Sequence, residues 1–397
     1  MKEQIYIDNA STSWPKPEKV YDFMVEFYRS CGINPGRSGS NKAVEAEDTI
    51  EDLRKRLTSF FGGDEDTPER LCFGYNATDS LNLIIQGLLS SGDHVVTTNL
   101  EHNSVIRPIN HLVQDIGVQA TFVPFNEQGF VEPDNIKKSI KSNTKLVIVN
   151  HGSNVLGTIQ PIAEIGAICR EAGVAFAIDV SQTAGVVPIN MKEMNIDVLA
   201  FTGHKSLMGA TGIGGMCVRK HLDIRHTRSG GSGILSASPF HLDEYPYRME
   251  YGTPNIVGIA SLWAGLDWID EKGGIDTIYT HEMKLAHKLV DAFHQTDGVT
   301  TYCCDNLDNH LPTITMNIDK LEADDVGNML DTDYNIATRT GLHCAPLVHK
   351  QLGTMDIHGA VRFSIGPFNT EEHINTAIEA IKEISKRAKA TKQSAIQ

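Results

Sequence analysis

A lysine and a carboxylate each stand at the end of an apolar run, where the strands of a parallel sheet would end. Lys205 lies in FTGHKSLMGATGIGG, and Asp179 ends the run VAFAIDV. A partly desolvated lysine has the lowered pKa that an imine-forming amine needs, and a buried carboxylate needs a cation. Together they predict a pyridoxal phosphate site in which Asp179 pairs with the protonated pyridine nitrogen. A surface lysine and an aspartate that caps a helix remain as alternatives.

Other polar residues could hold the rest of such a cofactor. GYNATDSLNLII follows an apolar run and opens a helix, so the backbone N–H groups of Ala77 and Thr78 could bind a phosphate. Gln182, three residues after Asp179, could reach the ring hydroxyl, and His102 in EHNS could stack on the ring. Each signal alone is weak, because threonines at helix starts and structural histidines are common.

The elements that must position these residues alternate from about residue 41 to 275. Apolar runs and amphipathic stretches follow one another, which predicts βαβ units and a mostly parallel sheet. Helices are expected over EDTIEDLRKRLTSFF and DSLNLIIQGLL. The candidate strands are almost wholly apolar, as strands covered on both faces are, and they begin at Leu71, His94, Lys145, Val174, Val198 and Gly214. Ligands of such sheets collect at the carboxyl ends of the strands.

The pattern changes after about residue 275 and predicts a smaller α+β domain. A long helix is expected over residues 276–295 and a short one around residues 323–329, with apolar runs at LPTITMNI, residues 334–338 and AVRFSIG. The last helix has an apolar face that is formed by Ile374, Ile378, Ile381 and Ile384.

Composition and charge exclude several classes of protein. The 397 residues include 35 Lys and Arg against 50 Asp and Glu, a net charge of −15 that argues against a nucleic-acid partner. No apolar run approaches the ~18 residues of a membrane span, and the start MKEQIYIDNAST lacks a signal-peptide core. We therefore expect no membrane association and a cytoplasmic protein. The seven cysteines include no CxxC, which predicts reduced thiols, no disulfide framework and no metal site.

Taken in order, the motifs resemble class V aminotransferase-fold enzymes, specifically cysteine desulfurases and selenocysteine lyases. The resemblance covers essentially the whole chain and rests on A-T near residue 78, E-H at 101–102, SNVLGTIQPI at 153–162, D-x-x-Q at 179–182, T-G-H-K at 202–205, MEYGTPN at 249–255, RTGLHCAP at 339–346 and AVRFSIGPFNTEEHI at 360–374. It implies the α/β fold type I of pyridoxal-phosphate enzymes. A large cofactor-binding domain with a mostly parallel seven-stranded sheet would span residues 15–265, and a smaller α+β domain would combine residues 1–14 and 266–397.

The resemblance also implies how pyridoxal 5'-phosphate is held. Lys205 would be the Schiff-base lysine, Asp179 and Gln182 would contact the ring nitrogen and hydroxyl, and His102 would stack on the ring. The phosphate would lie between groups on several elements, namely Ala77, Thr78, Thr202 and His204. Thr253 would reach the phosphate of the other subunit's cofactor, so that a homodimer shares its active sites.

The implied substrate groups centre on a reactive thiol. Arg362 would clamp the substrate carboxylate, Asn154 would lie beside cofactor and carboxylate, and Arg339 would lie close to the catalytic loop. Cys344 would accept sulfur as a thiolate, helped by a cation such as His343 or Arg339. Lys205, Cys344 and His102 would thus be the catalytic residues. A cysteine can also be a small, unreactive residue of the core, and this role suits the cysteines that lie in apolar runs, namely Cys72, Cys169 and Cys217. The adjacent Cys303 and Cys304 are also expected to be structural.

The implied reaction converts L-cysteine to L-alanine. Lys205 would remove the Cα proton and Cys344 would take the sulfur as a persulfide, while L-selenocysteine could release selenium instead. The short R-x-G-x-H-C loop resembles the group II, sulfur-mobilisation type, which implies a protein acceptor for sulfur or selenium. Leu342 and Thr202 depart from the common pattern and leave substrate and acceptor open. An aminotransferase or epimerase that acts on another small amino acid without a thiol is the alternative enzyme, and a non-catalytic scaffold would be expected to lack Lys205.

Overall fold

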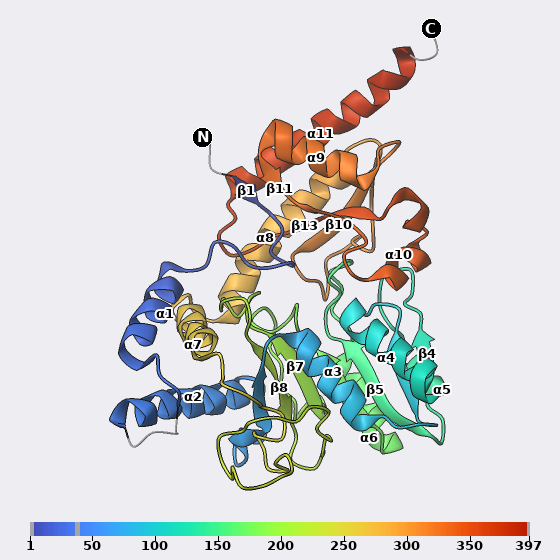
Figure 1. Cartoon of the computed structure of the whole chain (residues 1–397). Helices are drawn as coiled ribbons and strands as arrows, with labels where there is room; N and C mark the ends of the chain where they lie inside the picture. The colour runs from blue at the N-terminus through green and yellow to red at the C-terminus, as the bar shows by residue number, and fades with distance from the viewer. Residues whose placement is uncertain (1–3, 36–39, 395–397) are drawn as a thin grey trace.

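The computed structural model describes residues 4–35 and 40–394, in which a large sheet lies below a smaller one (Figure 1). The large sheet has the order β2-β8-β7-β6-β5-β3-β4. Its strands are β2 (Leu71–Gly74), β3 (His94–Thr98), β4 (Gln119–Val123), β5 (Thr144–Asn150), β6 (Ala175–Asp179), β7 (Val198–Thr202) and β8 (Gly214–Val218). β8 runs antiparallel to both of its neighbours, β2 and β7, and the other neighbouring pairs are parallel. The predicted mostly parallel seven-stranded sheet is therefore confirmed.

Helices cover both faces of this sheet because its strands present apolar side chains on both. Val147 and Val149 of β5 pack into one core with α1, α2, α6 and α7, whereas Leu146 and Ile148 pack into the other with α3 and α4. The helices here are α1 (Glu18–Cys31), α2 (Asn41–Phe60), α3 (Ala77–Leu88), α4 (Asn103–Ile116), α5 (Pro133–Ser139), α6 (Ile162–Ala172) and α7 (Ile256–Glu271), with a short 3₁₀ helix at Pro68–Arg70.

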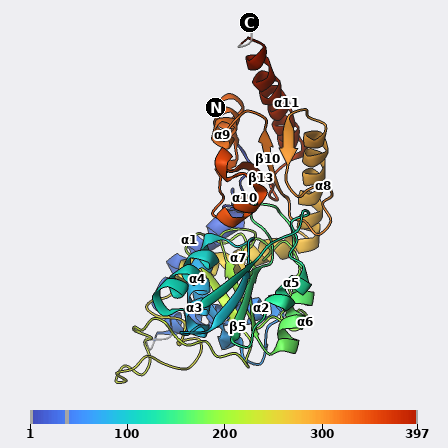
Figure 2. The same ribbon diagram turned by 90° about the vertical axis from the view of Figure 1, so that its right-hand side faces the viewer.

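A second core lies around a four-stranded antiparallel sheet of order β12-β13-β10-β9. Its strands are β9 (Val299–Thr301), β10 (Thr313–Ile318), β12 (Arg339–Gly341) and β13 (Ala360–Ser364). The helices are α8 (Ile275–His294), α9 (Ala323–Tyr334), α10 (Pro346–Leu352) and α11 (Glu371–Ser394), with a 3₁₀ helix at Met355–Ile357. β1 (Ile5–Tyr6) pairs with β11 (Ile336–Ala337), which brings the start of the chain to this part. Figure 2 shows the same stacking from the side, and the predicted isoleucine face of α11 is buried in this core.

Three details differ from the predictions. β4 was missed because its side chains are mostly half-buried or exposed and form no apolar run. α9 extends to Tyr334 instead of ending near residue 329, so only Ile336–Ala337 of the run at 334–338 forms a strand. The side chain that caps α3 is Asn76, which accepts a hydrogen bond from the N–H of Asp79, and Thr78 lies inside the helix.

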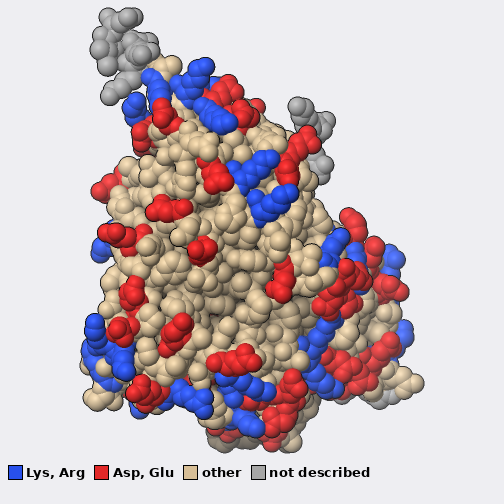
Figure 3. Space-filling model, turned by 180° about the vertical axis from the view of Figure 1, so that it is seen from behind, with Lys and Arg blue, Asp and Glu red and all other residues tan. Residues whose placement is uncertain are grey.

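The described part of the chain shows neither a membrane-spanning helix nor a metal cluster. No helix within residues 4–35 and 40–394 is long and apolar enough to cross a bilayer. The same residues contain no group of three or more His, Cys, Asp or Glu side chains that could hold a metal ion. On the face shown in Figure 3, basic side chains lie beside acidic ones and form no large patch of their own.

Candidate active site

The carboxyl ends of β5, β6 and β7 meet at one cavity of about 280 Å³. Asp179 ends β6 and stands in register with Asn150 of β5 and Ala200 of β7. Lys205 follows the end of β7 by three residues, while the first turns of α3 and α4 supply the opposite wall. Nine residues predicted to contact the cofactor line this cavity, namely Ala77, Thr78, His102, Asn154, Asp179, Gln182, Thr202, His204 and Lys205.

Lys205 faces this cavity, which leaves the surface-loop alternative without support. The pKa of its amine is lowered to about 8, because burial, with a smaller contribution from Arg362, outweighs the opposite effects of Asp179, Asp8 and Cys344. The lowered pKa agrees with the prediction.

Asp179 is buried, and its carboxylate organises the turn after β6. Its Oδ1 accepts hydrogen bonds from the N–H and the hydroxyl of Ser181, at 2.9 and 2.5 Å. The chain after β6 forms turns and no α-helix, so the alternative that Asp179 caps a helix is wrong. Gln182 donates from Nε2 to the carbonyl of Ala10 at 3.0 Å.

Several buried polar atoms at the cavity have no partner among the described residues. They include Thr202 Oγ1, His204 Nδ1 and Asn154 Oδ1. Burial lowers the pKa of His204 to about 4, so its ring is neutral at pH 7. The first N–H groups of α3 lie at the same cavity, because the helix begins at Ala77. A helix N-terminus together with unpartnered hydroxyl and imidazole groups suits a phosphate, so these residues fit pyridoxal phosphate.

His102 has a structural role and also lines the cavity. It is the N-cap of α4, where Nδ1 accepts the N–H of Ser104 at 3.0 Å. Burial lowers the pKa of His102 to about 4. The neutral ring therefore carries its proton on Nε2. The two readings of this histidine, structural and cofactor-binding, are compatible.

Arg362 is buried and held by residues from distant parts of the chain. Its Nη2 lies 2.6 Å from Asp8 Oδ1 and 2.9 Å from Ser11 Oγ, and its Nη1 donates to the carbonyl of Asn154 at 2.9 Å. Its buried Nε has no partner in the described part of the chain. Arg339 lies opposite Arg362 in the β12–β13 register and is exposed. Sequence reasoning missed Asp8 and Ser11, although YIDNAST places a carboxylate after an apolar pair.

Cys344 is the only exposed cysteine of the seven. Cys72, Cys169 and Cys217 are buried, as predicted for inert thiols. The loop of Cys344 is fixed by the side chain of Asn154, which donates to the carbonyl of His343 at 2.7 Å, and by the N–H of Asn103, which donates to the carbonyl of Cys344 at 2.7 Å.

The suggestion that His343 supplies a cation to Cys344 is wrong. His343 is buried, and burial together with Arg362 and His349 lowers its pKa well below the usual range. Its ring is therefore neutral at pH 7. Arg339, the other suggested cation, carries a guanidinium that remains charged.

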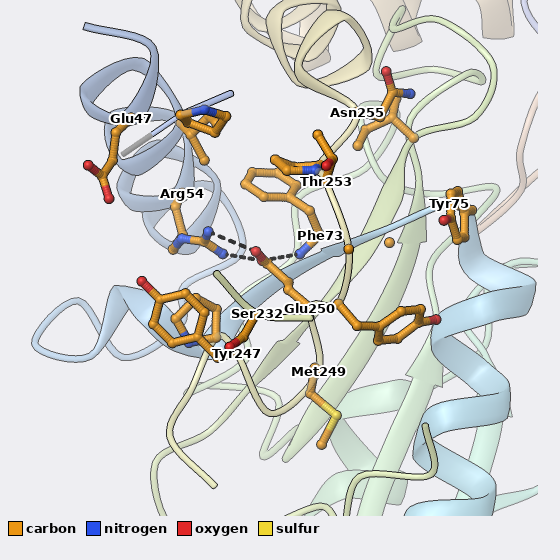
Figure 4. A pocket seen from close by; sticks show the side chains of 18 of the residues that line it. Glu47, Arg54, Phe73, Tyr75, Ser232, Tyr247, Met249, Glu250, Thr253 and Asn255 are labelled. Atoms are coloured by element: carbon orange, nitrogen blue, oxygen red, sulfur yellow. Dashed lines mark hydrogen bonds and ion pairs between the residues drawn. The ribbon is translucent and has the colours of Figure 1, made fainter. Parts of the chain in front are cut away.

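Thr253 does not line the cavity of Lys205. It is exposed and borders a separate cavity of about 140 Å³ between α2, β2 and its own loop (Figure 4). In that cavity Glu250 accepts hydrogen bonds from both terminal nitrogens of the buried Arg54 and from the N–H of Phe73. This ion pair ties the Thr253 loop to α2 and β2. The role predicted for Thr253 toward a second subunit stays a prediction.

A parallel sheet covered on both faces, with a lysine, a carboxylate and a phosphate-binding helix at its carboxyl edge, defines a pyridoxal-phosphate protein of the α/β type. The model of the family Aminotransferase class-V matches residues 5–376. The chain therefore belongs to this family, whose members depend on pyridoxal phosphate.

Known relatives resemble the chain over nearly its full length. A probable cysteine desulfurase of Pyrococcus abyssi is 34% identical over 98% of this chain and 96% of its own. A cysteine desulfurase of Escherichia coli is 30% identical over 96% of this chain and 93% of its own. The apo structure of a cysteine desulfurase from Thermococcus onnurineus NA1 has a TM-score of 0.90 at 35% identity, and covers 96% of this chain and 95% of its own.

Proposed function

We propose that this protein is a pyridoxal-phosphate-dependent cysteine desulfurase that converts L-cysteine to L-alanine and transfers the sulfur to Cys344. The observation that carries the proposal is the combination of a low-pKa lysine in the cavity and a single exposed cysteine, whose loop is hydrogen-bonded to the cavity residue Asn154. An aminotransferase or epimerase needs the lysine and has no use for the thiol. Relatives that carry the name cysteine desulfurase support the same assignment.

Each residue of the cavity has a defined task in this proposal. When bound, pyridoxal phosphate supplies an electron sink that acidifies the Cα–H bond of an amino acid and labilises its C–S bond. Asp179 holds the positive charge of the ring nitrogen, and His102 orients the ring. Thr202, His204 and the first turn of α3 anchor the phosphate. Lys205 would hold the cofactor covalently, and its amine would move the Cα proton.

The substrate meets Arg362 and Cys344. Arg362 binds the carboxylate, with Asp8 and Ser11 holding the guanidinium in place. The thiolate of Cys344 attacks the substrate sulfur, so that an S–S bond forms as the C–S bond breaks. The electron pair of the broken bond remains with the carbon fragment, which gains a proton and leaves as alanine. One cysteine and one enzyme thiol thus give one alanine and one persulfide, and no external oxidant is consumed.

Several finer features belong to the same proposal. L-Selenocysteine is a second substrate, with selenium released in place of sulfur. The exposed position of Cys344 suits transfer of the persulfide to an acceptor protein. Two copies of the chain form a homodimer in which Thr253 of each copy reaches the cofactor phosphate of the other. The protein acts in the cytoplasm.

The test supplies purified protein with L-cysteine and, separately, L-selenocysteine, and measures alanine together with sulfide or selenide. Cys344→Ala should abolish alanine formation from cysteine, and Lys205→Ala should abolish all activity. Cys303→Ala, a partly buried cysteine outside the cavity, is the matched control and should retain activity. If neither substrate gives alanine, or if Cys344→Ala desulfurates cysteine normally, the proposal fails.

A further inference from the structure

Three buried side chains form a hydrogen-bonded chain behind Cys344. Nδ1 of His343 lies 3.2 Å from Nε2 of His349, and Nδ1 of His349 lies 2.8 Å from Oγ1 of Thr354. At the other end, Nε2 of His343 lies 3.3 Å from the carbonyl oxygen of Arg339. The exposed fractions of His343, His349 and Thr354 are only 5%, 0% and 2%. None of the predicted cofactor or substrate contacts uses His349 or Thr354.

The acceptor at one end fixes the direction of the whole chain. A carbonyl oxygen only accepts, so Nε2 of His343 must carry a proton and donate to Arg339. In a neutral His343 ring Nδ1 is then an acceptor, so Nε2 of His349 donates to it. The remaining nitrogen of His349 must accept, and the hydroxyl of Thr354 is its donor. That hydroxyl also has a longer alternative, the carbonyl of His349 at 3.4 Å.

The surroundings keep both rings neutral, as this direction requires. Burial lowers the pKa of His349 to about 4. Burial also lowers the pKa of His343, and the nearby cations Arg362 and Arg339 lower it further. Arg362, one of these cations, is itself paired with the carboxylate of Asp8 at 2.6 Å. Protonation of His343 would set its Nδ1–H against the Nε2–H of His349, whereas protonation of His349 would only reverse the hydrogen bond to Thr354.

The chain supports a backbone conformation that is unusual for side-chain-bearing residues. His343 and Cys344 have φ angles of +50° and +58°, both in the left-handed region. Such residues persist only where the surroundings hold them, and they cluster at functional sites. Asn154 and Asn103 hold the two carbonyls of this turn, and the ring of His343 is held by His349 alone on its Nδ1 side. That support comes from His349 of α10, whose ring is in turn held by Thr354 after this helix, while the carbonyl of Arg339 in β12 holds the Nε2 side.

We propose that His349 and Thr354 are positioning residues for Cys344, because they fix the ring of His343 and with it the left-handed turn that presents the thiol. The inference rests on the proposed function in one respect, that Cys344 is the sulfur acceptor. It predicts that loss of the chain frees the thiol while it impairs delivery of the thiol to the substrate sulfur.

The first pair of variants is Thr354→Val and Thr354→Ser. Valine keeps the volume and removes the hydroxyl donor, whereas serine keeps the donor. Thr354→Val should lower kcat by roughly tenfold or more, since small displacements of reacting groups are costly, and leave KM for L-cysteine within about twofold. Thr354→Ser should match the unmodified protein. The second pair is His349→Leu, which lacks a donor to His343, and His349→Gln, which can supply one and should recover part of kcat.

The second readout is alkylation of Cys344 by iodoacetamide, followed by peptide mass analysis. Thr354→Val and His349→Leu should raise the rate of Cys344 alkylation by roughly threefold or more, because the loop loses local stability. The buried Cys72 should stay unmodified. A general loss of stability would expose Cys72 as well, and would overturn the inference. So would unchanged kcat and alkylation in folded Thr354→Val and His349→Leu, or a Thr354→Ser variant as impaired as Thr354→Val. If the protein makes no alanine from cysteine, the proposed function fails, and alkylation still decides the role of the chain.

Discussion

Uptake of pyridoxal phosphate by the cofactor-free protein should follow the titration of Lys205. Only a neutral amine attacks the aldehyde, and burial lowers the pKa of this amine to about 8. At pH 7 roughly one such amine in ten is neutral, compared with about one in 2,500 for an ordinary lysine of pKa about 10.4. The structure therefore predicts association about 200-fold faster at pH 7 than an unperturbed lysine would allow.

Stopped-flow absorbance of the bound cofactor, recorded from about pH 6.5 to pH 10, measures this rate. It should rise with pH and level off above pH 8, and the cofactor phosphate does not interfere because it titrates near pKa 6. Lys205→Ala should show no covalent uptake. Asp179→Asn removes a carboxylate that raises the pKa of Lys205, so its midpoint should lie at lower pH. A rate that still climbs about tenfold per unit beyond pH 9, as for an ordinary lysine, would refute the burial argument.

Three further predictions concern charged groups around the site. Glu250→Gln should lower the free energy of unfolding by about 2–4 kcal/mol, because it deprives the buried Arg54 of its main partner. Glu51→Gln removes a more exposed partner of Arg54 and should lower the free energy of unfolding by less than about 1 kcal/mol. Equal losses of the two variants in urea unfolding would contradict this. Arg362→Lys should raise KM for L-cysteine roughly tenfold with a smaller change in kcat, since lysine lacks the planar guanidinium that binds a carboxylate with two hydrogen bonds. Unchanged steady-state kinetics would argue against a contact between Arg362 and the substrate carboxylate. Burial raises the pKa of Glu101 from 4.5 to about 8, so the folded protein holds a proton that the unfolded chain releases, and stability falls as pH rises between these values. Glu101→Gln should flatten that slope in urea unfolding at several pH values, and an unchanged slope would show that Glu101 is ionised in the folded protein.

The sequence predicts the sheet and its carboxyl edge well, because both depend on local patterns. Short, almost wholly apolar runs identify strands that are buried on both faces, and parallel strands necessarily end at the same edge. Lys205 and Asp179 could therefore be brought together without knowledge of any long-range contact. Where the pattern is weak the prediction fails, as for β4, whose partly exposed side chains resemble those of a loop.

The environment of each side chain is less predictable. The partner of Arg362 is Asp8, 354 residues earlier in the chain, and no spacing rule connects them. The charge of His343 was predicted wrongly, because the motif RTGLHCAP shows that His343 is next to Cys344 in the sequence but does not show that its ring is buried. The resemblance to a known family assigns roles to residues whose environment the sequence does not reveal, but only to residues to which the family gives a role. It gives none to His349 and Thr354, so the sequence did not identify them.

The neutral histidines limit how the site can respond to pH. Burial holds the pKa values of the surrounding imidazoles far below 6.5, as it does for His102, His204, His343 and His349. None of them changes charge between pH 6 and pH 8, so they act as fixed donors and acceptors and not as proton carriers. Proton transfer in this range falls to Lys205, whose pKa of about 8 is matched to it. Arg362 is paired with Asp8, and Asp179 acts electrostatically on Lys205. The presence of both cations and carboxylates suits a zwitterionic amino acid, which brings one carboxylate and one amine.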